Sequence, residues 1–161
     1  YDISACLVGS EMCIRDRRVM IEDFFPTILE MAGVKEYSTV QTTDGVSFAD
    51  VLLNPSTRHE RSIVWHFPNL WGETQNTEEG YGAYSSILKG DYHLIYHWET
   101  QQRRLYNVRA DIGEQHDLAL EQPAIAEALA RELTDYLKST DAQRPTYIAT
   151  GEACLYPDGS K

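Results

Sequence analysis

The sequence predicts an α+β fold in which helices flank a small antiparallel sheet of about four strands. Apolar residues recur at helical spacing near residues 21–32 and again near residues 125–137. Short runs rich in β-branched and aromatic residues lie between these two segments. The chain has 161 residues, of which 42% are hydrophobic, so it can bury the core of one ordinary domain.

The first helix is predicted over residues 23–32, where apolar side chains form one wide face. Asp23 is the expected N-cap, Pro26 fits the first turn, and Gly33 can end the helix in a left-handed conformation. Ser47 can then cap a short helix over residues 48–53, which Asn54-Pro55 ends.

Four strands are expected in the middle of the chain, over residues 62–67, 84–89, 92–98 and 103–108. Gly90-Asp91 separates the second strand from the third and is typical of a tight hairpin turn. The strand order is not deducible from these patterns. Residues 69–82 are polar and aperiodic, which predicts an exposed loop.

The last helix is predicted over residues 123–138, beginning at Pro123, and an extended tail follows it. Residues 111–118 indicate an irregular polar turn. Residues 1–17 share no pattern with the rest, and their string CLVGSEMCIRDR resembles translated sequencing-adapter sequence. We interpret them as an artefact, with an irregular leader as the alternative.

The chain is acidic, with a formal net charge of −11 and a pI near 4.8. This balance argues against nucleic-acid binding and against docking on anionic lipid. No apolar run reaches the roughly 18 residues that a membrane span needs. The three cysteines predict neither a disulfide framework nor a zinc site, because their number is odd and no Cys-x-x-Cys pair occurs.

Four stretches resemble the C-terminal part of the sulfatase family, a branch of the alkaline-phosphatase-like superfamily. In order they are DFFPTILEMAGV with DGVSFADVL, IVWHFP, YSSILKGDYHLIY with LYNV, and DIGEQHDLA. The resemblance implies that residues 18–55 end the main domain and that residues 56–161 form the C-terminal subdomain of a sulfatase-like α/β fold. An N-terminal α/β domain would then cover the apolar helix faces. The sequence departs from the family where Leu88 and His93 replace an expected arginine and lysine.

The resemblance also implies what the parent enzyme does. Sulfatases hydrolyse sulfuric esters with a calcium ion and a formylglycine, which is made within a Cys/Ser-x-Pro-x-Arg motif, and they are often exported. That motif lies upstream in the family, so we expect this fragment to hold no catalytic residue, no metal ligand, no cofactor and no activity. Cys13 and Arg17 have the motif's spacing, but Arg15 stands where proline belongs.

Two residues are candidates for binding a sulfated small molecule or glycan. His66 ends a predicted strand directly before Phe67-Pro68, and its ring can hydrogen-bond a sulfate oxygen or a sugar hydroxyl. The alternative is a half-buried histidine that packs beside Trp65 and Trp71. Trp71, in the loop that follows, can stack on a sugar face. His93 and His97 share one strand face and are interpreted as sheet-surface residues.

Other readings of the chain stay open at this point. The parent can be a phosphodiesterase or phosphonate hydrolase of the same superfamily, or the fragment can be a free-standing carbohydrate-binding module. The carboxylates of residues 111–117 can bind a cation, although turn and capping roles suit a single loop better. A serine-hydrolase site is not predicted, because no Gly-x-Ser-x-Gly sequence occurs.

Overall fold

The computed structural model describes residues 18–54, 56–57, 59–69 and 82–161. The chain divides into two compact units, Tyr1–His59 and Glu60–Lys161. Residues 1–17, which we interpret as an artefact, lie outside the described residues, and so does the Cys13–Arg17 pair within them. No helix in the described ranges is long and apolar enough to cross a membrane.

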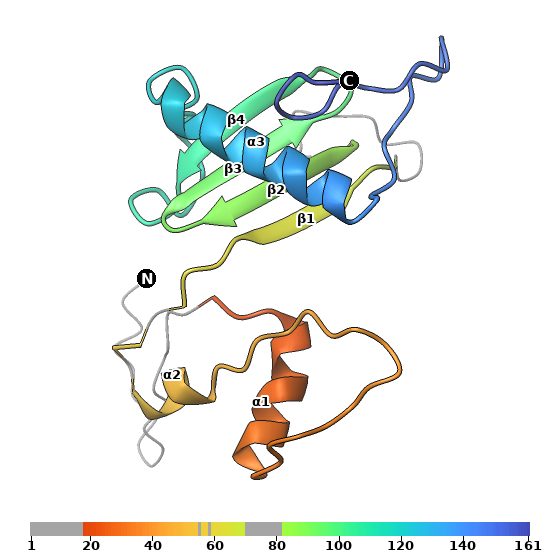
Figure 1. Cartoon of the computed structure of the whole chain (residues 1–161). Coiled ribbons are helices and arrows are strands. Elements are labelled where there is room, and N and C mark those ends of the chain that lie inside the picture. Colours follow the sequence, from red (N-terminus) through yellow and green to blue (C-terminus); the bar gives the residue numbers. More distant parts are fainter. Residues whose placement is uncertain (1–17, 55, 58, 70–81) are drawn as a thin grey trace. The chain divides into compact units, whose positions relative to one another are not determined.

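The first unit contains a 3-10 helix, η1 (Ile21–Asp23), followed by α1 (Phe24–Met31) and α2 (Ala49–Leu53) (Figure 1). Gly33 has φ +78°, so the helix ends in the left-handed conformation predicted for it. Asp23 occupies the N-cap of α1 but makes no capping bond to that helix. Its carboxylate instead accepts the backbone N–H of Met20 at 2.7 Å and that of Val46 at 3.0 Å.

Asp23 and Thr27 together attach the segment before α2 to α1. The Thr27 hydroxyl donates to the Asp23 carbonyl at 2.6 Å and accepts the N–H of Phe48 at 3.0 Å. A Cβ at Gly45 would lie 2.1 Å from the Glu22 carbonyl oxygen, so only glycine permits this approach of the two backbones. The Asp-x-x-Pro-Thr pattern of the sequence is therefore explained by local structure.

The first unit, taken by itself, leaves much apolar surface exposed. Ile28 of α1 is 62% exposed and Leu53 at the end of α2 is 87% exposed. Phe24, Phe25 and Met31 are also exposed, although Phe24 makes an edge-to-face contact with Phe48. A wide apolar face on a short helix is typical of a surface that another layer covers.

The second unit is a four-stranded antiparallel sheet with one helix on it. The strands are β1 (Ile63–Phe67), β2 (Tyr84–Lys89), β3 (Tyr92–His97) and β4 (Gln102–Asn107), in the spatial order β1-β2-β3-β4. All four predicted strands are confirmed, with ends that shift by at most one residue. Gly90 has φ +55°, which provides the tight turn between β2 and β3.

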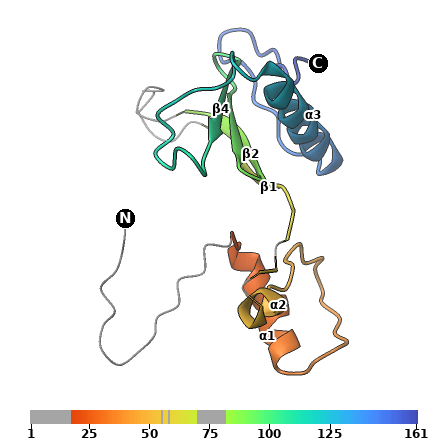
Figure 2. The same cartoon turned by 90° about the vertical axis from the view of Figure 1, so that its left-hand side faces the viewer.

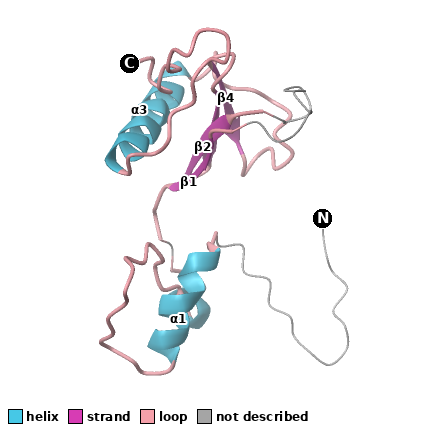
Figure 3. Ribbon diagram, turned by 90° about the vertical axis from the view of Figure 1, so that its right-hand side faces the viewer, coloured by secondary structure: helices cyan, strands magenta, loops and turns pink. Residues whose placement is uncertain are grey.

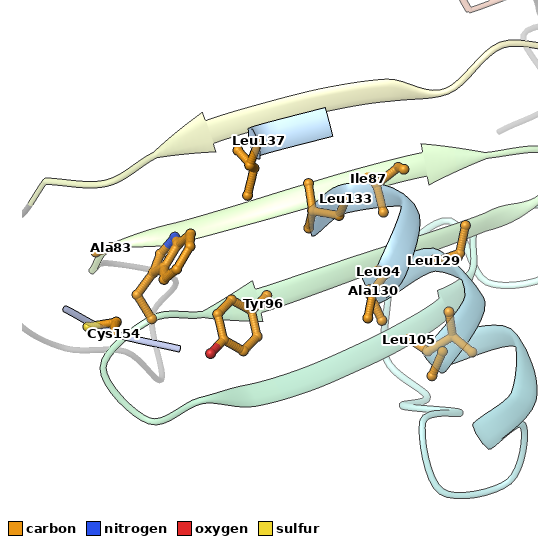
Figure 4. Close-up of a cluster of buried hydrophobic side chains, with 12 residues drawn as sticks. Ala83, Ile87, Leu94, Tyr96, Leu105, Leu129, Ala130, Leu133, Leu137 and Cys154 are labelled. Atoms are coloured by element: carbon orange, nitrogen blue, oxygen red, sulfur yellow. The ribbon is translucent and has the colours of Figure 1, made fainter. Parts of the chain in front are cut away.

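Helix α3 (Pro123–Ser139) lies along one face of the sheet, as Figures 2 and 3 show from opposite sides. Its apolar side chains meet alternate residues of the strands in one continuous core. The members of that core, most of them labelled in Figure 4, are Ala83, Ile87, Leu94, Tyr96, Trp98, Leu105, Ala126, Leu129, Ala130, Leu133, Leu137 and Cys154.

Polar contacts fix the position of α3 on the sheet. Glu132 accepts hydrogen bonds from the Ser62 hydroxyl and from the Lys89 ammonium, the latter at 2.7 Å. These bonds join the middle of the helix to the start of β1 and the end of β2. A shift of α3 along the sheet would break both hydrogen bonds.

We expect the substitution Leu133→Ala to lower the free energy of unfolding of the second unit by about 2–5 kcal/mol. Leu133 is fully buried at the helix–sheet contact, so truncation leaves a cavity. Asp135→Ala, on the exposed side of the same helix, is the matched control and should change the value by about 0.5 kcal/mol or less. Equal effects of the two substitutions in urea denaturation would contradict this account of the core.

Candidate functional site

His66 lies near the end of β1, in register with Ser85 of β2. Its Nδ1 is 2.7 Å from the Ser85 Oγ, and its Nε2 is 2.9 Å from the backbone carbonyl oxygen of Gln143. The indole Nε1–H of Trp98 donates to the same Ser85 Oγ at 2.9 Å. These four residues, which we call the His66 hydrogen-bond chain, connect β1, β2 and the residue after β3 with the segment that follows α3.

The donors and acceptors in this chain can be assigned from chemistry. A carbonyl oxygen only accepts, so Nε2 of His66 carries the hydrogen and donates to Gln143. The Nδ1 of a neutral ring then accepts, which makes the Ser85 hydroxyl its donor. Ser85 therefore donates to His66 while accepting from Trp98. Both ring nitrogens of His66 are engaged within the second unit.

The surroundings of His66 favour the neutral ring. Burial lowers the pKa of His66, and the hydrogen bond to the Gln143 carbonyl opposes that shift only in part. The ring also makes an edge-to-face contact with Trp98, with centroids 6.1 Å apart. His66 is thus half-buried beside Trp98, a tryptophan that sequence reasoning did not name, and binding of a ligand would require exchanging one of its present partners.

The segment that carries Gln143 is attached to the helix and the sheet. The ring of Tyr156 lies 4.6 Å from the Lys138 Nζ and 4.9 Å from the Arg144 Cζ, so two cations contact one aromatic ring. The Tyr96 hydroxyl donates to the Leu155 carbonyl at 2.9 Å. The extended tail predicted after residue 139 is therefore packed against the second unit and supplies a partner for His66.

The second sequence candidate, Trp71, lies outside the described residues, so its contact with a sugar stays a prediction. Sequence reasoning missed Ser85 and Gln143, because neither belongs to a recognisable motif. Only the strand register identifies Ser85 as the neighbour of His66. Gln143 lies 77 residues away along the chain, which no local pattern can connect.

The polar turn of residues 111–118 uses its carboxylates for backbone hydrogen bonds. Asp111 accepts the N–H groups of Gln115 and His116 at 2.7 and 2.8 Å. Asp117 accepts those of Leu105 and Ala119 at 3.0 and 2.9 Å. The described part of the chain contains no group of three or more His, Cys, Asp or Glu residues that could hold a metal ion.

His93 and His97 lie on the sheet face that points away from α3. The Nδ1 of His93 is 2.6 Å from the Glu114 carboxylate, and its ring contacts Trp65 edge-to-face. His93 pairs in register with Leu88, so the two positions at which the sequence departs from the family face each other. The Nε2 of His93 and the Nδ1 of His97 are buried and have no hydrogen-bond partner within the described part of the chain.

Comparison with known proteins gives one clear sequence relative. The chain is 32% identical over 143 residues to a curated protein of Formosa agariphila named "Sulfatase", and the match covers 84% of this chain but 26% of that protein. A scan against protein-family models finds no match. The chain thus spans about a quarter of the length of the curated relative that it matches.

Solved structures share the fold, for example the following two. One is a protein in complex with its substrate D-glucosamine-2-N,6-O-disulfate, with TM-score 0.55 and 24% identity over 76% of this chain and 24% of that chain. The other is a 2-O GAG sulfatase, with TM-score 0.51 and 21% identity over 74% of this chain and 24% of that chain. In both cases the likeness extends over the greater part of this chain.

We expect the second unit to lose stability as the pH falls from about 7.5 to about 5.5. Burial lowers the folded-state pKa of His66 and of His97, and Arg104 lowers that of His97 further. The unfolded chain, in which histidine has a pKa of about 6.5, then binds more protons than the folded chain. The contribution of these histidines to the unfolding free energy is therefore fully present above the unfolded-state pKa. It is lost as the pH falls from that pKa toward the lowered folded-state pKa.

The measurement is urea denaturation across this pH range, compared between the wild type and His66→Gln, His97→Gln and the double variant. Each single substitution should reduce the pH dependence of the unfolding free energy, and the double substitution should reduce it most. Carboxylates contribute little in this range, because they titrate near pH 4. An unchanged pH dependence in the double variant would refute the assignment.

Proposed function

Because this chain belongs to the sulfatase family and corresponds to its C-terminal part, we propose that the longer protein containing it hydrolyses sulfate esters of carbohydrates. The observation that carries the proposal is the 32% identity to the Formosa agariphila sulfatase across 84% of this chain. Structural relatives that act on sulfated sugars support the same substrate class. The proteins compared favour neither a phosphodiesterase or phosphonate hydrolase nor a free-standing carbohydrate-binding module.

The chemistry of the reaction belongs, in this proposal, to other parts of the longer protein. Calcium would stabilise charge on the sulfate oxygens, and formylglycine would supply the nucleophile. The described residues offer no group of metal ligands that fits the calcium ion, so no step is assigned to them. Because the resemblance places the nucleophile motif and the calcium ligands upstream of this segment, we expect no turnover by this chain alone.

The rest of the longer protein is also the proposed partner of the first unit. The chain covers about a quarter of its relative's length, which leaves ample sequence to form a main α/β domain. Ile28 and Met31 on α1 and Leu53 on α2 are exposed apolar side chains that such a domain would bury. We propose export to the periplasm or the cell exterior for the longer protein, by resemblance to the family alone.

The proposed function can be tested by expressing the longer natural protein and measuring release of sulfate from a sulfated glycosaminoglycan in the presence of calcium. A matched aryl phosphodiester is the control substrate. Sulfate release with little phosphodiester cleavage is the expected result, and the reverse preference would overturn the proposal. The 161-residue chain should release no sulfate, so measurable turnover by it would refute the placement of the active site elsewhere.

His66 is the residue of the described chain that we propose to contact the substrate. Its Nε2–H already donates to a carbonyl oxygen, and a sulfate or sugar oxygen is an acceptor of the same kind. Contact requires substrate to replace Gln143 as that acceptor, while the Ser85 hydroxyl keeps the ring oriented. Support comes from the position of His66 near the end of β1, directly before Phe67-Pro68.

Two substitutions in the longer protein separate a substrate contact from a structural role. His66→Gln should raise KM by roughly tenfold or more, because a hydrogen bond to a charged group contributes about 1.5–3 kcal/mol. Ser85→Ala breaks the same hydrogen-bond chain but keeps the ring, so it should lower Tm with a smaller change in KM. If both substitutions lower Tm and leave KM unchanged, His66 is only a packing residue.

A further inference from the structure

The sheet face that points away from α3 has an unusual distribution of charge. Residues paired in register share a face, so the side chains on this one follow from the strand pairing. They are Ile63, Trp65 and Phe67 of β1, Tyr84, Ser86 and Leu88 of β2, His93, Ile95 and His97 of β3, and Gln102, Arg104 and Tyr106 of β4. None of these is Asp or Glu, although the chain has 25 acidic residues against 14 Lys and Arg.

Arg104 occupies the centre of the basic part of this face. It pairs in register with Ile95, so His93 and His97 are its diagonal neighbours on β3. Among the described residues, no carboxylate lies within ion-pair distance of Arg104. The Glu114 carboxylate, on the loop after β4, is bonded to His93.

Two buried nitrogens on this face lack hydrogen-bond partners among the residues that the structure describes. They are the Nδ1 of His97, a residue that is only 7% exposed, and the Nε2 of His93. A buried polar atom left unpaired costs about 1–3 kcal/mol, so an absent partner is the usual explanation. Burial lowers the pKa of His97, and the positive charge of Arg104 lowers it further. An anion that displaced the groups burying this nitrogen would accept its hydrogen bond and neutralise the charge of Arg104.

Aromatic rings surround these basic groups. Trp65 is 39% exposed, Tyr106 lies beside Arg104, and Phe67 and Tyr84 pack together with ring centroids 5.9 Å apart. Apolar ring faces complement the C–H faces of a sugar, and a guanidinium with a nearby N–H complements a sulfate group. The strands contribute aromatic and basic but no acidic side chains to this face, which fits a ligand that combines an apolar surface with an anionic group.

We propose that this face binds the sulfate group of a sulfated sugar, with Arg104 as its charge partner and the Nδ1–H of His97 as a hydrogen-bond donor. The proposal rests on the proposed function, because it places a second sulfate of the same polymer on this chain. It concerns recognition alone and adds no step to the hydrolysis.

The test follows the His97 ring signals of the 161-residue chain by NMR during titration with glucosamine 6-sulfate, inorganic sulfate or unsulfated glucosamine, with chloride at matched ionic strength. Saturable shifts with both sulfated ligands are expected. Tighter binding of the sulfated sugar would identify a sugar-borne sulfate, and equal binding would identify the free anion. Equal shifts with unsulfated glucosamine or chloride would overturn the proposal.

Arg104→Gln should weaken sulfate binding by roughly tenfold or more. Arg103→Gln is the matched control, because residue 103 is exposed and adjacent on the same strand but points to the opposite face. Arg104→Lys keeps the charge and should restore part of the affinity. Equal weakening by Arg103→Gln and Arg104→Gln would overturn the assignment.

The wild-type titration decides the proposal even if a variant fails to fold. Absence of any saturable shift in the wild-type chain overturns the binding site. That result would leave sulfate release by the longer protein unaffected, so the two failures are distinguishable.

Discussion

The apolar contact between α3 and one face of the sheet determines which side chains the second unit buries and which it exposes. Leu133 and Ala130 of the helix are fully buried, as are Ile87, Leu94 and Leu105 of the strands. Because side chains alternate along a strand, burying these residues fixes which side chains face the helix and which face away. A slip of one residue in any strand would move its apolar set to the other face.

The same contact places the polar residues of the unit. Ser85 lies on the helix side of the sheet, where it accepts from Trp98 and donates to His66. His66 in turn donates to the Gln143 carbonyl. Arg104 lies on the opposite side by the same alternation. On the helix side both ring nitrogens of His66 have partners, whereas two buried nitrogens on the other side have none among the described residues. The two faces therefore differ in how fully the chain itself satisfies their histidines.

Sequence patterns predicted the elements well because the forces that define them are local. Strand alternation, the Gly90 turn and the Pro123 helix start each depend on neighbouring residues, and the structure contains all of them within a residue or so of the expected ends. The partners of His66 and Asp23 could not be predicted in this way. Their hydrogen bonds join positions 77 and 23 residues apart, so they exist only after the chain has folded.

The hydrogen bonds of Asp23 and Thr27 have a further consequence for the stretch between the two helices. They hold Val46 and Phe48 at the start of α1, so both ends of the connection over residues 34–44 are fixed in space. The entropy of closing such a loop grows slowly, by about 0.6 kcal/mol for each doubling of its length. Residues 34–44 are therefore the part of the first unit where the chain can gain or lose residues with little effect on its helices.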